Sequence, residues 1–261
     1  MKKRTRKEID VKTCEKPESL TGAILEPTKE GLLLDDDESR LYMFDKLLKD
    51  ETLADYVEAA LEVDRPSGPN FFGYVKPRDE VCYISDHNNN RAEKKPYTYK
   101  GVNHKTLRYP NHVLVVVSKI QSILNNRIPT HDCQRLWTAT DTLLCDKHSR
   151  GGFIDAHSDT DTKNLNLVVI FSLGQSRWLR IRNKETLRYS NVLVPHNSLV
   201  VMSGPKFQQN FTHELIRLTP SDVIGQHLSL EIRFLKGPMW YNSSRQFFPQ
   251  SNKEKTKDID D

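Results

Sequence analysis

The pattern of hydrophobic and polar residues changes character along the chain, near Pro129. Before it, apolar residues recur every three or four positions from Asp36 to Asp64 and again from Asn111 to Asn125, which predicts amphipathic helices. The apolar positions of the first stretch are Leu41, Phe44, Leu47, Leu48, Leu53, Tyr56, Val57, Ala60 and Leu61. We expect one or two helices from this stretch and one from the second, all covering a sheet.

Eight short strand-like runs follow Pro129, and turn residues such as Gly174, Gly204 and Gly225 separate several of them. The runs lie at about 133–145, 152–157, 165–173, 177–183, 186–194, 197–203, 210–218 and 226–236. Eight short antiparallel strands after a helical preface predict an α+β fold, in which a double-stranded β-helix, or jelly roll, carries N-terminal covering helices.

These patterns divide the chain into four segments. Residues 1–35 form a basic tail that we expect to be disordered, and residues 242–261 form a flexible polar tail. Residues 36–128 hold the helices and an aromatic-rich region, and residues 129–241 hold the jelly-roll core. The basic run at the start is a nuclear import signal, a phosphate-seeking arm or simply a solvated tail, and the sequence leaves these alternatives open.

Composition narrows the class of protein. The 261 residues carry a net charge of +4, which permits a polyanionic partner without requiring one. The four Cys are far apart and form no CxxC motif, which argues against a zinc ribbon or a disulfide framework and favours a reducing compartment. The sequence has neither a long apolar run nor an apolar stretch after the basic start, so we expect no membrane span and no secretion. We expect a monomer in the nucleus or cytoplasm.

The run Gly152–Asp161 contains His157 and Asp159, two positions apart. On an extended strand both side chains point the same way, so together they can chelate one metal ion. His213, in the alternating run Asn210–Leu215, is the candidate for a second His ligand. Two His and one carboxylate on one face of an ion make the triad of non-haem Fe(II) oxygenases. A lone His on a strand is more often structural, so the interpretation depends on the whole pattern.

A further cation completes this pattern. Arg233 lies in the alternating run Leu228–Phe234, which would carry its guanidinium inward. A guanidinium is charged at any ordinary pH and can hold a carboxylate with two parallel hydrogen bonds.

Residues 65–108 are rich in aromatic side chains with lysines between them. The aromatic residues are Phe71, Phe72, Tyr74, Tyr83, Tyr97 and Tyr99, and the lysines are Lys94, Lys95 and Lys100. They are suited to a stacking platform for a nucleobase. Aromatic residues that fix a long loop to the core would give the same composition.

With these residues in place, the β half of the chain resembles the AlkB family of iron- and 2-oxoglutarate-dependent dioxygenases. The matching segments are His157-x-Asp159-x-Asp161, Phe171–Gly174, Ser198–Gly204, His213 and Leu228-x-Leu230-x-x-Arg233. Upstream, Pro77 to Tyr83 and Tyr97–Gly101 resemble the nucleotide-recognition lid of the DNA-repair members.

The resemblance implies a catalytic centre in which His157, Asp159 and His213 bind Fe(II), with 2-oxoglutarate and O2 as cosubstrates. It implies that Arg233 faces the 1-carboxylate of 2-oxoglutarate. The reaction implied is oxidative demethylation of alkylated DNA or RNA bases, which releases succinate, CO2 and formaldehyde. The substrate-binding residues implied are Asp161, which would contact a base, and Tyr83, Tyr97 and Tyr99, which would flank a flipped base.

The chain departs from the family in the cosubstrate pocket. Where the family has Asn-x-Tyr before the HxD motif, this chain has Asp146-Lys147-His148, and His227 replaces an Arg that receives the distal carboxylate. If Asp146, His148 and His227 line the pocket, His227 is an ionic partner only while it is protonated. The alternative is that another cation, such as Arg177 or Arg217, holds this carboxylate.

Two other functions remain open from the sequence. The same chemistry would serve on a methylated protein such as a histone tail. The altered pocket is also compatible with a non-catalytic jelly-roll module that has lost cosubstrate binding, whereas the complete triad favours the enzyme.

Overall fold

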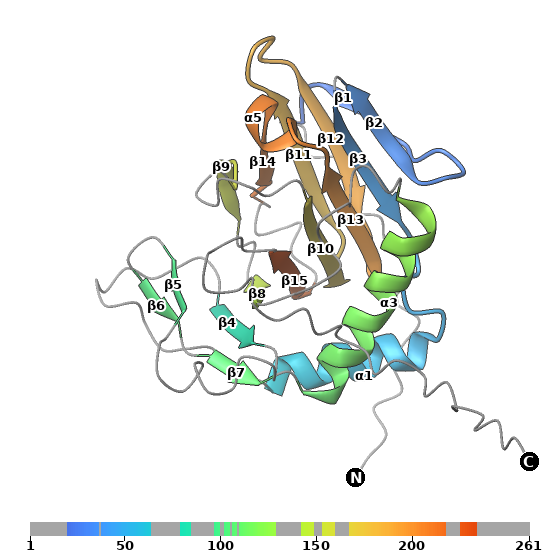
Figure 1. Ribbon diagram of the computed structural model, residues 1–261, viewed down its shortest axis with the longest axis vertical. Helices are drawn as coiled ribbons and strands as arrows, with labels where there is room; N and C mark the ends of the chain where they lie inside the picture. The colour runs from blue at the N-terminus through green and yellow to red at the C-terminus, as the bar shows by residue number, and fades with distance from the viewer. Residues whose placement is uncertain are drawn as a thin grey trace, which may run out of the picture.

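Two β-sheets packed face to face form the frame of the molecule (Figure 1). The computed structural model describes residues 20–36, 38–63, 79–84, 97–99, 102–104, 106–108, 110–128, 142–148, 153–159, 167–217 and 225–233. Within these ranges, each helix is too short or too polar to span a bilayer.

The minor sheet has five strands, with β9 at its edge. In spatial order they are β1 (Ala23–Ile24), β12 (Tyr189–Val194), β11 (Arg177–Asn183), β14 (Phe211–Leu215) and β9 (Ile154–His157). The major sheet has eight strands, in the order β2 (Leu32–Asp36), β3 (Ser39–Phe44), β13 (Ser198–Ser203), β10 (Leu167–Gly174), β15 (His227–Arg233), β8 (Thr142–His148), β4 (Asp79–Ile84) and β7 (Thr106–Arg108). A separate hairpin pairs β5 (Tyr97–Tyr99) with β6 (Val102–His104).

Strands β8 to β15 confirm the predicted jelly roll. Apart from the consecutive pair β11 and β12, which share the minor sheet, successive strands change sheet, so that β13, β10, β15 and β8 face β12, β11, β14 and β9. Strand β8 begins later than the run predicted at 133–145, since it covers Thr142–His148, and residues 129–141 lie outside the described ranges.

Strand β10 has an almost continuous apolar sequence because it is buried on both faces. Leu167, Val169 and Phe171 pack into the core beneath the helices, while Val168 packs into the core between the two sheets. A strand buried on both faces needs apolar residues at nearly every position.

Two helices cover the outer face of the major sheet, as the sequence predicts (Figure 1). They are α1 (Glu51–Val63) and α3 (Asn111–Arg127). The carboxylate of Asp50 accepts a hydrogen bond of 2.9 Å from the backbone N–H of Thr52, which caps the start of α1. The only other helix in the described residues is the short α5 (Phe207–Asn210), which leads into β14.

The predicted helix around Leu41 and Phe44 is wrong, because residues 39–44 form strand β3 beside β13. Leu41 and Met43 pack between the sheets, and Tyr42 packs on the opposite side with the helices. Burial of both faces removes the alternation that marks a strand, and the remaining apolar spacing resembles that of a helix.

The predicted disordered tail also extends too far, because residues 20–35 include β1 and most of β2. Asn191 of β12 holds this segment. Its side-chain amide donates to Thr21 O at 2.8 Å, and its backbone carbonyl accepts from the N–H of Leu25 at 2.9 Å. The partner is far away in the sequence, so local composition does not reveal the pairing.

We expect Phe171→Ala to lower the free energy of unfolding by about 3–5 kcal/mol, because it leaves a cavity where a fully buried ring packs beneath the helices. Urea unfolding measures the change. The matched control is Tyr56→Ala on α1, where the side chain is 56% exposed and the change should stay within about 0.5 kcal/mol. A loss at position 171 no larger than at position 56 would contradict the description of this core.

Candidate metal centre

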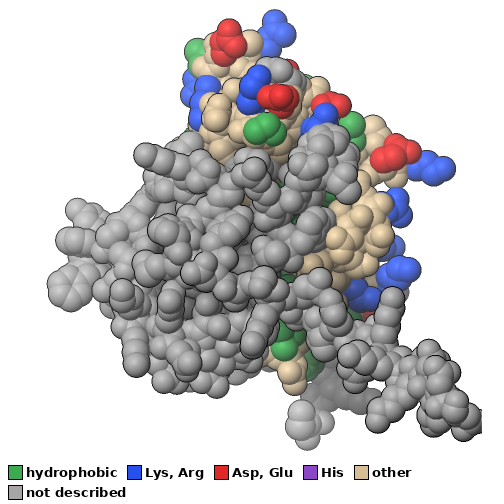
Figure 2. Space-filling model, viewed as in Figure 1, with side chains coloured by type: hydrophobic (Ala, Val, Ile, Leu, Met, Phe, Trp, Pro, Cys, Tyr) green, Lys and Arg blue, Asp and Glu red, His purple; other side chains and the backbone are tan. Residues whose placement is uncertain are grey.

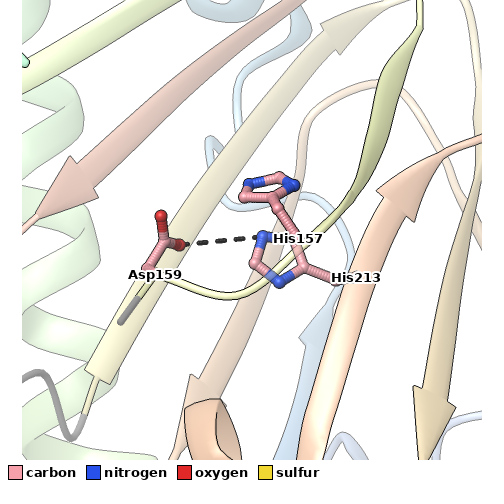
Figure 3. A group of neighbouring side chains, drawn as sticks. All are labelled: His157, Asp159 and His213. Atoms are coloured by element: carbon pink, nitrogen blue, oxygen red, sulfur yellow. Dashed lines mark ion pairs between the residues drawn. The ribbon is translucent and has the colours of Figure 1, made fainter. Parts of the chain in front are cut away.

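The structure brings His157, Asp159 and His213 together at the edge of the minor sheet (Figure 3). His157 ends β9 and lies directly opposite His213 of β14, and the centroids of the two rings are 4.3 Å apart. Asp159 follows two residues later, with its Oδ2 atom 3.7 Å from Nε2 of His213. Candidate ligand atoms of all three residues lie within 4.8 Å of one another.

The chemistry of these side chains fits Fe(II). Asp159 and His213 are each only 5% exposed, and a carboxylate buried so deeply requires a cation or strong hydrogen bonds. The separation of 3.7 Å is too long for a hydrogen bond, and both atoms can approach one ion placed between them. Two imidazoles and one carboxylate are the donors that non-haem Fe(II) uses.

His157 is held in the orientation that a ligand needs. Its Nδ1 atom is 2.8 Å from the carbonyl oxygen of Asp155, and a carbonyl can only accept, so the Nδ1–H donates. The proton on Nδ1 leaves the lone pair of Nε2 for a metal. A hydrogen bond from the other ring nitrogen to a backbone carbonyl is a common support of a metal-bound imidazole.

The two His residues of the triad line a cavity between the two sheets. Besides His157 and His213, the lining residues are Ile154, Ile170, Ser172, Leu179, Val194, Val200, Leu215, His227, Ser229 and Glu231. An apolar wall with a few polar groups is typical of a small-molecule site. Ser172 and Ser229 are paired across β10 and β15, so their hydroxyls enter the cavity from neighbouring strands.

His227 is one of the residues that line this cavity. It is 3% exposed, and its Nδ1 atom is 2.9 Å from the carbonyl oxygen of Gln175, to which the Nδ1–H must donate. Burial, with the nearby positive charge of Arg177, lowers the pKa of His227 from its usual 6.5 to about 3. At neutral pH His227 is therefore uncharged, and it could be the ionic partner of a carboxylate only if its pKa were raised.

The other predicted cosubstrate residues are placed by their main chain only. Asp146 and His148 of β8 pair with Ser229 and His227 of β15, next to the strand that lines the cavity. Arg233, at the end of β15, pairs with Val168 of β10 and with Thr142 of β8. The side chains of Asp146, His148 and Arg233 lie outside the described part of the structure.

The predicted substrate residues are described still less. Tyr83 lies on β4 opposite Leu143 of β8, and Tyr97 and Tyr99 lie on β5. Their side chains are outside the described part of the structure, as is the whole of Asp161.

The sequence did not single out Ser172, Ser229, Glu231 or Gln208. Counting back from Arg233 in steps of two gives Glu231, Ser229 and His227, so strand periodicity alone could have placed Ser229 and Glu231 on the face of His227. Gln208 contacts the main chain of Asp159 from a separate segment, and no sequence signal indicates that contact.

Comparison with known proteins gives a family for this arrangement. The profile of the 2OG-Fe(II) oxygenase superfamily matches residues 40–245, which is most of the chain. No curated protein sequence matches it. Among solved structures, one described as "The structure of OsALKBH1" is similar, with 15% sequence identity and a TM-score of 0.49, over 74% of this chain and 97% of that chain.

The low pKa of His227 predicts a specific acid sensitivity. Below pH 6.5 the unfolded chain binds a proton at this residue that the folded protein excludes, so acid favours unfolding. Between pH 7.5 and pH 5 this residue should remove about 2 kcal/mol from the free energy of unfolding. In His227→Asn, whose amide N–H can still donate to Gln175, this contribution should be absent. Urea unfolding across the pH range measures it, and the same pH dependence in both proteins would contradict the burial of a neutral His227.

Proposed function

Because this chain belongs to the 2OG-Fe(II) oxygenase superfamily, we propose that it is an AlkB-like dioxygenase that removes methyl groups from alkylated bases of DNA or RNA. Membership of the superfamily makes it an oxidoreductase that uses Fe(II), 2-oxoglutarate and O2. The observation that carries the proposal is the convergence of His157, Asp159 and His213 in a jelly roll, where the two His residues line a cavity between the sheets. The demethylase activity rests on the resemblance of the sequence motifs to the AlkB family.

In this proposal His157, Asp159 and His213 bind Fe(II). With 2-oxoglutarate and O2 bound, the metal supplies the oxidation that hydroxylates an N-methyl group, which then leaves as formaldehyde. The chain contributes position and charge. The Nδ1–H of His157 holds the ring on Asp155 O, and the buried carboxylate of Asp159 offsets part of the charge of the metal.

Arg233 receives the 1-carboxylate of 2-oxoglutarate, with Asp146, His148 and His227 around the cosubstrate. For the distal carboxylate we favour Arg177 over Arg217. Arg177 is 1% exposed and lies close enough to His227 to lower its pKa, so its charge acts in a dry environment. Arg217 is exposed to solvent, and its Cζ atom lies 3.8 Å from the centroid of the Phe153 ring.

Asp161, Tyr83, Tyr97 and Tyr99 are the proposed contacts to the base, which must be flipped out of a duplex before its methyl group is accessible. The charges on the described part of the face shown in Figure 2 do not favour one class of substrate over the other. On the described part of the face in Figure 2, basic and acidic side chains are interspersed rather than gathered into one basic patch. A methylated protein therefore stays the alternative substrate.

We expect succinate release to depend on methylated single-stranded oligonucleotides, with an equal amount of formaldehyde. The assay compares methylated single-stranded DNA, duplex DNA, RNA and basic peptides under identical Fe(II) and 2-oxoglutarate concentrations. Asp159→Ala removes a proposed ligand and should lower turnover more than the roughly 10–100-fold typical when only a supporting group is lost. If only the peptides support turnover, the substrate is a methylated protein. If the protein does not bind 2-oxoglutarate at all, the result favours the non-catalytic module.

Arg177→Met should weaken 2-oxoglutarate binding roughly 10–100-fold, because a hydrogen bond to a charged group contributes about 1.5–3 kcal/mol. Arg177→Lys, which keeps the charge, should lose less. Calorimetric titration of the Fe(II)-loaded protein without oxygen measures the affinity, and circular dichroism confirms that each variant is folded. Arg217→Met is the control and should bind normally. If Arg217→Met loses affinity while Arg177→Met retains it, the assignment is reversed.

A further inference from the structure

The carboxylate ligand Asp159 lies beyond the sheet that holds the two His residues. Strand β9 ends at His157, and its last pairing with β14 is the one between His157 and His213. The chain has therefore left the ladder of backbone hydrogen bonds when it reaches Asp159. Its carboxylate still lies 3.7 Å from Nε2 of His213, so other contacts must position this segment.

Two hydrogen bonds attach the segment to the corner where α5 enters β14. The backbone N–H of Asp159 donates to Oε1 of Gln208 at 2.9 Å, in a buried position. The hydroxyl of the preceding residue, Ser158, donates to the carbonyl oxygen of Phe211 at 2.9 Å. Both acceptors come from residues 208–211, immediately before His213.

This corner is itself firmly anchored in the fold. Phe207 and Phe211 are 1% and 4% exposed, and their ring centroids lie 5.2 Å apart in the core between the sheets. Lys184, the residue after β11, donates its backbone N–H to Asn210 O and its Nζ to Gln208 O, each at 2.8 Å. Gln208 is thus held by the packing of Phe207 and Phe211 on either side of it and by the hydrogen bond to its own carbonyl.

The orientation of the Gln208 amide follows from its contacts. Since the N–H of Asp159 can only donate, the amide must present its oxygen to it. The amide nitrogen then lies 3.9 Å from Sδ of Met202, a weak acceptor. Gln208 is 6% exposed, so loss of its oxygen would leave the N–H of Asp159 without this acceptor in a dry environment.

We propose that Gln208 is a positioning residue for the metal centre, which sets the main chain of Asp159 so that its carboxylate faces His213. This inference rests on the proposed role of the triad in binding Fe(II). The α5–β14 corner then fixes two ligands at once, since His213 follows on its own strand and Asp159 is held through the Gln208 side chain. Gln208 touches neither metal nor substrate, and it acts only through the main chain of Asp159.

The test compares the metal affinities of Gln208→Met, Gln208→Glu and Gln209→Ala with that of the wild type, by anaerobic Fe(II) or Mn(II) titration. Gln208→Met fills similar space without an acceptor and should bind metal about 10–100-fold more weakly. Gln208→Glu keeps an oxygen acceptor and should restore most of the affinity. Gln209 is the exposed neighbour on α5, so Gln209→Ala should bind as the wild type does.

A second readout separates positioning from general destabilisation. In Gln208→Met the melting temperature of the metal-free protein should stay close to that of the wild type while the metal affinity falls. The backbone amide of Asp159 should exchange its hydrogen faster in this variant. Normal metal affinity in Gln208→Met would overturn the proposal, as would equal losses in Gln208→Met and Gln208→Glu. If Asp159→Ala binds metal as tightly as the wild type, the triad assignment itself fails, which is a different result.

Discussion

The site depends on one register, the pairing of β14 with β9 that sets His213 directly opposite His157. A shift of one residue would turn one of the two imidazoles to the other face of the sheet, and no ion could then bridge them. The apolar residues between the sheets hold this register by keeping the inner faces together. The helices on the major sheet bury the opposite face of its strands, and so stabilise the wall of the cavity that faces the triad.

The parts that sequence predicted well are those with local signals. The eight strands of the jelly roll and both long helices follow from periodicity, and the triad follows from residue types at a spacing that strands bring together. Strands β1 and β3 were missed because β1 pairs with the distant β12 and β3 with the distant β13, and β2 was missed with them because it pairs with β3. The charge state of His227 could not be predicted, because a side chain's pKa depends on burial and on neighbours such as Arg177, which sequence does not show.

At His227 the wall of the cavity presents a neutral imidazole, and the permanent cation of Arg177 lies near it. The neutral His227 keeps its hydrogen bond to Gln175, and the charge of Arg177 opposes protonation. In the family pattern an Arg stands where this chain has His227, whereas in our proposal the positive charge comes from Arg177 on β11, in the other sheet. Charge can thus be supplied from either sheet of a jelly roll, because the inner faces of both point to the same space.

Strand β9 is an edge strand, and within the described residues β14 is its only neighbour in the sheet. An edge strand is held by one ladder instead of two, so it can separate from the sheet at a lower free energy than the strands inside it. Two of the three proposed metal ligands belong to β9 and the residues just after it, while the third is on an inner strand. A metal bound by all three residues would connect the edge strand β9 to the inner strand β14 in addition to their backbone hydrogen bonds. The local stability of one sheet edge is therefore linked to the concentration of free metal.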